Sequence, residues 1–473
     1  MRTPERAAAV VAGALAVGTL VAAAVAPPAR VPNGFAIVGA TVIDGTGGPA
    51  RPDTVVVVEG ERIKAVGSRA EVPLAKGLRI VDGRGRWVMP GLVDAHVHFF
   101  QSGGAYTRPD VIDLRGHRSY EQEIAGVKQR LDATFARYLL CGVTSVVDAG
   151  GPLWNFDVRD RAARTALAPR VAVAGPLVST VARPQLDLGD PPIVKVDSPA
   201  DARALVAREA ARRPDFVKIW FIQRPGDDPV AGRALLDAVV DEARRSGLRV
   251  AVHATELAGA RMAVEAGAAI LVHSVFDQPV DEAFVAAVRD KGVLYVPTLF
   301  VVKGYDLVLS GKFTPTAAEI RLGDPDALRS FEEVKAFPEF KGAGRPNADA
   351  ALKTGSENLR RLSAAGARIA AGTDAGNIGA LHGPSIYREL RLMVEAGMSP
   401  SAVLSAATLG GARVMGRQDE LGTLAAGKRA DLLILDGDPV TDLGVLETPR
   451  DVVKGGRIFS RDELARAAGP PAR

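Results

Sequence analysis

Residues 90–98 have the sequence Pro-Gly-Leu-Val-Asp-Ala-His-Val-His, a short apolar run that ends in two histidines separated by one residue. Side chains alternate faces along a strand, so residues i and i+2 point the same way. His96 and His98 would therefore project together from one end of a buried strand, as two arms of a metal clamp. The alternative is a histidine pair without ligand duty, and the pair alone does not separate the two.

After this stretch the sequence alternates between apolar runs and helical segments. Helices are expected at 231–246, 256–266 and 281–291. Fully apolar strands covered by amphipathic helices indicate a parallel sheet, and eight such repeats indicate a closed (β/α)₈ TIM barrel over residues 89–420. A doubly wound open sheet is the alternative fold. The eight expected strands lie at 92–98, 143–150, 170–176, 216–221, 248–254, 269–274, 293–299 and 367–376.

The two ends of the chain have a different sequence pattern. Short β-branched runs separated by glycine-rich turns fill residues 34–88, and similar runs return in residues 421–460. We expect these two segments to form one composite β-sandwich satellite domain.

Two long connections interrupt the barrel pattern, at residues 99–120 and 300–347. Long excursions at the mouth of a barrel are often functional lids. His117 lies in the first of them, and as a single loop histidine it is expected to be exposed to solvent.

The first residues have the layout of an export signal. Arg2 and Arg6 precede an apolar run that ends near Ala26 and is followed by two prolines. Residues 1–26 are therefore expected to be a signal peptide or an uncleaved membrane anchor. The protein would be periplasmic or extracellular, free or anchored to the membrane. Cys141 is the single cysteine, which excludes an intrachain disulfide, and its apolar surroundings predict a buried structural thiol.

Composition sets broader limits on the partners. The 473 residues are 47% hydrophobic and 24% charged, which is typical of a globular protein. The net charge of +4 is dispersed along the chain without a Lys/Arg block, so no nucleic-acid partner is indicated. A homo-oligomer is compatible with this composition.

Further candidate ligands lie where other strands end, which is where the active sites of such barrels are built. His253 and His273 end the fifth and sixth strands, and Asp374 ends the eighth. Each alone has a plainer explanation: Asp374 could be a helix N-cap, and a single histidine could be a hydrogen-bonded core residue. Because all three are expected at one barrel mouth, together with the histidine pair, a metal site is favoured.

Lys218, in the apolar run FVKIWF, is the most informative residue. A lysine inside a buried strand is costly unless it is paired or neutralised. Burial lowers the pKa of the amine, and a neutral amine can react with carbon dioxide to give a carbamate. This anionic group has two oxygens and can bridge two cations. The alternative is an ion pair with a carboxylate such as Asp148 or Asp374.

The pieces GLVDAHVH, VKIW, VAVHA, LVHS, GTDAG and GTLAAGKRADLLILD resemble the amidohydrolase superfamily over nearly all of the chain after the N-terminal segment. The pattern is more similar to the imidazolonepropionase-like and prolidase-like branch than to urease or adenosine deaminase. The resemblance implies the dinuclear-metal type, with zinc as the expected ion, although Mn, Fe or Co also suit N/O ligands. It implies the following ligands: His96, His98 and Asp374 for the buried metal, His253 and His273 for the second, and carbamylated Lys218 as the bridge.

The expected reaction is hydrolysis of a C–N amide bond in a small molecule, such as a dipeptide or an N-acyl amino acid. Two cations that share a water lower its pKa, and a metal-bridging hydroxide would attack the carbonyl. Asp374 is the expected catalytic residue, which takes the proton and delivers it to the leaving nitrogen. His382 and Arg224 are candidate substrate contacts, against a packing role for the first and a surface salt bridge for the second.

Three alternative functions are kept. They are hydrolysis of a cyclic amide, lactone or ester, deamination, and metal binding by an exported protein without catalysis. Deaminases of this superfamily generally use one metal without a bridging lysine, so Lys218 argues against deamination. The complete ligand set argues against a protein that has lost catalysis.

Overall fold

The computed structural model describes residues 34–224 and 226–470. The expected signal peptide or anchor at residues 1–26 lies outside the described residues. Within the described ranges, no helix combines the length and the apolar character needed to cross a membrane.

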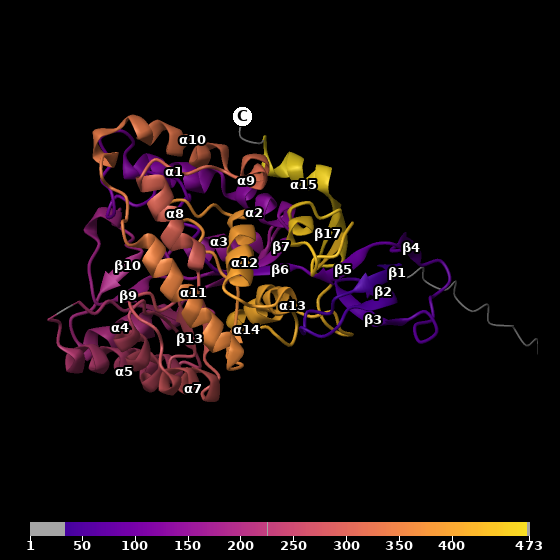
Figure 1. The fold of residues 1–473 in the computed structure, drawn as a ribbon, viewed down its shortest axis with the longest axis horizontal. Coiled ribbons are helices and arrows are strands. Elements are labelled where there is room, and N and C mark those ends of the chain that lie inside the picture. Colours follow the sequence, from indigo (N-terminus) through magenta and orange to yellow (C-terminus); the bar gives the residue numbers. More distant parts are fainter. Residues whose placement is uncertain (1–33, 225, 471–473) are drawn as a thin grey trace, which may run out of the picture.

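Strands from both chain ends form one eight-stranded mixed sheet, which lies at the right of the molecule in Figure 1. The strand order is β18-β17-β16-β5-β1-β2-β3, with β4 beside β1. The N-terminal strands are β1 (Gly34–Val42), β2 (Arg51–Glu59), β3 (Arg62–Ser68), β4 (Arg79–Asp82) and β5 (Trp87–Pro90). The C-terminal strands are β16 (Leu432–Leu435), β17 (Asp451–Lys454) and β18 (Arg457–Ser460). The two chain ends meet where β5 pairs antiparallel with β16.

Alternation along β2 explains why this sheet is covered on two faces. Val56 and Val58 pack in one apolar cluster together with residues of the C-terminal strands. Val55 and Val57 point the other way and pack in a second cluster under Val72. The four consecutive valines are therefore all buried, two on each face of the sheet.

The central part of the chain is barrel-like and built from parallel strands. One sheet contains β6 (Leu92–Val97), β7 (Val143–Asp148) and β8 (Arg170–Val173). A second has the order β10-β9-β11-β12-β13-β14-β15. Its strands are β9 (Leu177–Ser179), β10 (Ile193–Lys195), β11 (Val217–Trp220), β12 (Val250–His253), β13 (Ile270–Val272), β14 (Leu294–Val296) and β15 (Arg368–Ile369). All eight apolar runs expected to be strands contain one, and β9 and β10 are two additional strands, with β10 at the edge of its sheet.

The eighth strand differs from its expected form. β15 has only two residues, and the chain then follows β6 through single backbone hydrogen bonds. Ala95 N–H donates to Ala371 O at 2.9 Å, and His98 N–H donates to Ala375 O at 2.8 Å. The close approach needs Gly372, because a Cβ there would lie 3.0 Å from the His96 backbone nitrogen. The segment that carries Asp374 is therefore held directly against the strand that carries the histidine pair.

Helices cover the parallel strands, and the three helices expected from sequence are confirmed to within two residues as α5, α6 and α7. The helices outside the long connection are α1 (Tyr120–Gln129), α2 (Leu131–Leu140), α3 (Asn155–Ala162), α4 (Pro199–Ala210), α5 (Pro229–Arg245), α6 (Leu257–Ala266), α7 (Glu282–Asp290), α11 (Ala348–Ala364), α12 (Ser385–Glu395), α13 (Pro400–Ser405), α14 (Gly411–Met415) and α15 (Arg461–Ala468). Helix α7 shows the local cause: the Asp281 side chain caps the Phe284 N–H at 2.8 Å, and Phe284 and Val288 then turn to the core. Cys141, at the end of α2, is buried as expected, and burial raises its pKa to about 12.

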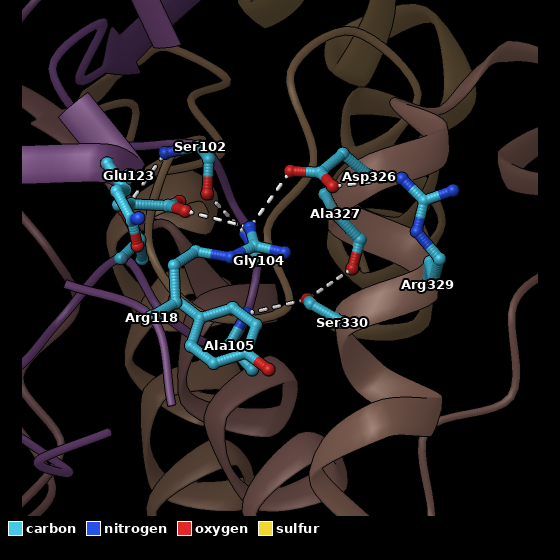
Figure 2. A network of polar contacts seen from close by, with 12 residues as sticks. Ser102, Gly104, Ala105, Arg118, Glu123, Asp326, Ala327, Arg329 and Ser330 are labelled. Atoms are coloured by element: carbon cyan, nitrogen blue, oxygen red, sulfur yellow. Dashed lines mark hydrogen bonds and ion pairs between the residues drawn. The ribbon is translucent and has the colours of Figure 1, made fainter. Parts of the chain in front are cut away.

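The long connection at residues 300–347 is largely helical. It contains α8 (Leu299–Leu309), α9 (Ala317–Leu322) and α10 (Pro325–Glu333). Helices α8 and α10 share an apolar cluster with residues of the 99–120 segment. Figure 2 shows the polar part of this contact, where Arg118 donates to Glu123 at 3.1 Å and to Asp326 of α10 at 3.0 Å. Beside it, the Ala105 N–H donates to the Ser330 hydroxyl at 2.9 Å. The two long connections therefore form one roof over the strand ends.

His117 belongs to this roof, and its expected exposure is confirmed. Its ring stacks on Phe337 with the centroids 3.7 Å apart, and its Nε2 lies 3.2 Å from Glu339. The side chain keeps 35% exposure because these contacts cover one face of the ring.

Candidate metal centre and active site

A cavity of about 480 Å³ opens where the parallel strands end. Its walls come from the strand ends, from the 99–120 segment through Arg108, and from α8 through Val301 and Tyr305. Five of the six candidate ligands reach its surface: His98, Lys218, His253, His273 and Asp374. The sixth, His96, is fully buried beneath them. The strands therefore bring together the whole set expected from sequence.

The histidine pair and the aspartate face one point. His96 Nε2 and His98 Nε2 are 3.2 Å apart, and Asp374 Oδ1 lies 3.4 Å from the first and 3.2 Å from the second. Burial acts to raise the pKa of Asp374, but the contact with His98 and the proximity of His273 and Lys218 outweigh it. The pKa of this carboxyl consequently lies below its usual value. Asp374 is an anion held among nitrogen donors.

Backbone and hydroxyl groups fix how two of the histidines are turned. His98 Nδ1 lies 2.7 Å from Gly150 O, and because a carbonyl only accepts, Nδ1 carries the proton. Its Nε2 is then the lone-pair nitrogen that faces the cavity. His273 Nδ1 lies 2.7 Å from the hydroxyl of Thr298, the residue just before α8. Each ring is thus held by a hydrogen bond at Nδ1, which leaves Nε2 to bind a metal ion.

Lys218 lies on β11 among these rings and is 1% exposed. In the described part of the chain, no carboxylate oxygen lies within 4.0 Å of its ammonium nitrogen, so the ion pair with Asp148 or Asp374 is not formed. Burial lowers the pKa of Lys218 to about 7, against the attraction of Asp374. Beside it, the rings of His253 and His273 are 4.4 Å apart, and Trp220 closes the wall next to His253. A buried amine thus lines the same cavity as the histidines, with no carboxylate at ion-pair distance in the described residues.

Backbone strain is concentrated at the same place. Five non-glycine residues have positive φ in residues 34–224 and 226–470, and three of them are His273 (72°), Thr298 (43°) and Asp374 (58°). A left-handed conformation costs such a residue about 1–3 kcal/mol, and it persists where the surrounding contacts impose it. Of these three residues, His273 and Asp374 line the cavity, and Thr298 bonds to the His273 ring.

Buried polar residues hold Asp374 in place, and sequence reasoning did not identify them. Asn377 Nδ2 donates to Asp374 Oδ1 at 2.8 Å, and its Oδ1 accepts from Arg108 at 2.6 Å and from the Tyr305 hydroxyl at 2.6 Å. Arg108 is anchored in turn by two hydrogen bonds to Asp110, at 2.7 and 2.8 Å. The spacing of three residues from Asp374 was the available signal for Asn377. Arg108 carried none, because it reaches the site from the 99–120 segment.

Asp94 fixes the two strands that carry the clamp. It is fully buried and accepts from the Thr373 N–H at 3.0 Å and from the Thr373 hydroxyl at 2.6 Å. Burial raises the pKa of Asp94 to about 7 despite these bonds. The residue tethers β6 to the segment that precedes Asp374.

The donor set fits a divalent cation. A tetrahedral ion with bonds of about 2.0–2.1 Å separates its ligands by about 3.3 Å, which is the spacing observed among His96 Nε2, His98 Nε2 and Asp374 Oδ1. His273 belongs to the same buried cluster, since its ligand atom lies within 4.8 Å of those of His96 and Asp374. Neutral imidazoles and one carboxylate are the ligands that zinc and related ions prefer.

The two candidate substrate contacts do not line the cavity. His382 is buried behind its wall, where Nδ1 lies 2.7 Å from the Tyr138 hydroxyl and Nε2 lies 2.7 Å from Gln101 O. Because both ring nitrogens are engaged, the geometry supports the packing role for His382. Arg224 is exposed, with its backbone N–H bonded to Asp227, and lies outside the cavity lining.

We therefore expect His382→Ala to lower stability. The substitution leaves a cavity and two buried polar groups without partners, which predicts a loss of about 2–4 kcal/mol in the free energy of unfolding. Denaturant titration followed by circular dichroism measures it. His117→Ala, at an exposed position, serves as the control with less than about 1 kcal/mol expected. Equal losses in the two variants would contradict the assignment.

Comparison with known proteins agrees with this site. The amidohydrolase family model matches residues 87–459. Over 458 aligned residues the chain is 27% identical to the ochratoxinase of Aspergillus niger, covering 88% of this chain and 85% of the relative. It is 28% identical over 406 residues to the imidazolonepropionase of Streptomyces avermitilis, covering 81% of each. The crystal structure of a Xaa-Pro dipeptidase with bound methionine in the active site matches with a TM-score of 0.68 at 25% identity, over 90% of this chain and 99% of that chain.

The matched segment contains all six candidate ligands, from His96 to Asp374, and all of the barrel-like part. The chain therefore belongs to the amidohydrolase family, in its imidazolonepropionase-like and prolidase-like branch, and it is a hydrolase that acts on carbon–nitrogen bonds.

Proposed function

We propose that the protein cleaves the C–N amide bond of a small molecule, a dipeptide or an N-acyl amino acid, with two divalent metal ions. The observation that carries the proposal is the convergence of the six ligand residues on one cavity. His96, His98 and Asp374 would hold the buried ion, and His253 and His273 the second. Zinc suits this set of nitrogen and oxygen donors.

Carbamylated Lys218 is the proposed bridge between the two ions. Its support is geometric: a buried amine lies among the histidines without a carboxylate within ion-pair distance in the described residues. The amine nitrogen attacks the carbon of carbon dioxide, an N–C bond forms, and one C=O electron pair moves onto oxygen. The nitrogen then loses a proton to water. The product is an anion with two oxygens, which supplies negative charge among neutral imidazoles.

The residues of the chain divide the chemical work. When bound, the metals supply a Lewis acid and lower the pKa of water. Asp374 accepts a proton from the attacking water and passes it to the leaving nitrogen, which is a poor leaving group without it. Asn377 keeps the Asp374 carboxylate turned toward the cavity through its 2.8 Å hydrogen bond. The roof of α8 and the 99–120 segment restricts water at the reacting bond.

The cavity lining favours a peptide-like substrate. Arg108 and Arg345 provide positive charge for a carboxylate, and Glu256 and Asp277 provide negative charge for an amino group. Phe100, Trp220 and Val301 add apolar wall for a side chain. A cavity of about 480 Å³ is of the size that encloses a small ligand. The relatives named after a dipeptidase and an ochratoxinase lend support to this class.

The same proposal covers the architecture and the location. We propose that the parallel strands close into a (β/α)₈ barrel, supported by the hydrogen bonds between β6 and the segment after β15. The sheet formed by both chain ends would be its satellite domain. Export to the periplasm or the cell exterior is proposed from residues 1–26 alone.

Metal and carbamate analysis tests the centre. Elemental analysis of protein expressed with zinc is expected to find about two metal ions per chain, and ¹³C NMR after growth with labelled bicarbonate is expected to show a carbamate carbon. A panel of dipeptides, N-acyl amino acids, cyclic amides and lactones then defines the substrate. Protein without bound metal would refute the centre. Turnover of lactones with no cleavage of amides would refute the substrate class.

Asn377→Leu tests the support of Asp374. The variant keeps the size of the side chain but loses the donor to Asp374 and the acceptor for Arg108. We expect kcat to fall by about 10–100-fold while the metal content is kept, because only the orientation of the carboxylate is disturbed. Steady-state kinetics on the best substrate of the panel measures the change. An unchanged kcat would show that Asp374 is positioned without this bond.

A further inference from the structure

A second large cavity lies where the terminal sheet meets the barrel-like part. It has a volume of about 370 Å³ and shares no lining residue with the active-site cavity. Its walls come from α3, the loop from α3 to β8, and the hairpin of β17 and β18. Cavities of about 300–1,000 Å³ hold small ligands in proteins. The proposed hydrolase activity has no use for this one.

The lining of this cavity, which we call the basic cavity, is strongly positive. The only acidic residue among its lining residues is Glu61. The basic residues are Arg159, Arg164, Arg170, Arg417, Lys454 and Arg457. A concave surface with charges of one sign concentrates ions of the opposite sign. The ligand indicated by this lining is an anion.

Within residues 34–224 and 226–470, two of the six cations have no carboxylate partner. The paired ones are Arg159 with Asp160, Arg170 with Asp431, Arg417 with Glu420 and Arg457 with Glu463. Arg164 and Lys454 have no carboxylate within ion-pair distance in the part of the chain that the structure describes. These two side chains lie on opposite substructures, one in the α3–β8 loop and the other at the end of β17.

Lys454 shows the cost of this arrangement. It is half-buried, and Asp431, the carboxylate that attracts it most, already accepts two bonds from Arg170 and one from the Gly455 N–H. Lys454 also stands directly opposite Arg457 in the antiparallel pairing of β17 with β18. Like charges directly opposite each other on a sheet are destabilising, and burial lowers the pKa of Lys454 to about 8. An anion at this point would relieve both effects.

We propose that the basic cavity binds a small phosphorylated molecule, held between Lys454 and Arg457 of the hairpin and Arg164 of the α3–β8 loop. Guanidinium forks match the oxygens of a phosphate, and the lysine adds a point charge. The cavity has room for a ligand body beyond one phosphate group. The bound ligand ties the terminal sheet to the barrel-like part and stabilises the folded chain, because it binds only the folded state.

Calorimetric titration of the full, metal-loaded chain with fructose 1,6-bisphosphate at constant ionic strength tests this site. We expect one ligand per chain with a Kd below about 1 mM and a rise in the midpoint of thermal unfolding. The double variant Lys454→Met/Arg164→Met is expected to weaken binding by at least about tenfold, since it removes both unpaired cations. Inorganic phosphate serves as a second probe: equal affinity identifies the free ion as the ligand, and weaker affinity identifies a phosphate ester.

Arg244→Met is the matched control, because Arg244 is 68% exposed on α5 and lies outside the cavity. It is expected to bind as the parent does. Absence of saturable binding would overturn the proposal, and so would equal binding by the double variant, which would place the anion elsewhere, such as at the metal centre. The single variant Arg164→Met, at an exposed loop position, keeps the test valid if replacement of Lys454 prevents folding.

Discussion

Asp374→Asn is expected to lower kcat by about 10²–10⁴-fold, the range lost when a positioned acid–base group is removed. The amide has nearly the shape of the carboxylate and can still accept from Asn377, but it cannot take the proton from water. Asp374 lies 3.2 Å from His98 Nε2 and is held by Asn377, so no other carboxylate of the described cavity lining can take over its place. Steady-state kinetics and elemental analysis of the same preparation measure the two roles of this residue.

Asp241→Asn is the control, because that side chain is 44% exposed on α5. It is expected to leave kcat unchanged. A kcat for Asp374→Asn within about tenfold of the parent enzyme would contradict the assignment, since proton transfer would then not depend on this residue.

Lys218→Ala is expected to remove most of the bound metal and most of the activity together. The deletion takes away the proposed bridging oxygens and leaves space at the floor of the cavity. Propionate, which brings a carboxylate of its own into that space, is expected to restore part of both the metal content and kcat. Elemental analysis with and without propionate is the primary measurement, so the result does not depend on the choice of substrate.

Two variants separate this role from a structural one. Lys195→Ala changes a lysine that is 44% exposed, and it is expected to alter neither the metal content nor the rate. Lys218→Met is expected to unfold at a temperature no lower than the parent apoprotein, because an apolar chain replaces a buried amine without counter-charge. A Lys218→Ala protein that keeps its metals and its rate would contradict the bridge.

The strand pattern was readable from sequence because it is local. Apolar runs of strand length between helical periods locate β6, β7 and β11 to β14, and His96 with His98 lie on one face through simple alternation. The length of the eighth strand was overestimated. After Ile369 the chain runs close against β6 at Gly372 and does not form a regular ladder with it.

The side chains that loops contribute to the site could not be predicted from the sequence in the same way. Arg108 and Tyr305 are 197 residues apart and meet at Asn377 through the packing of the two long connections. His382 looked close to the mouth because it follows the eighth strand, yet its ring turns back to Tyr138. Side chains on irregular segments point where tertiary contacts hold them, and no period in the sequence records this.

The sequence by itself thus determined the eight apolar strand runs and the six ligand candidates, because strand alternation and the ends of parallel strands place them by rule. Only the tertiary structure decided which ring nitrogen of His98 faces the cavity, since that depends on the carbonyl of Gly150, 52 residues away. It also decided that Lys218 has no counter-ion in the described residues and that Asn377 supports Asp374. These features arise from contacts between distant segments, and their energies are set by burial and hydrogen bonding that form only when the chain is folded.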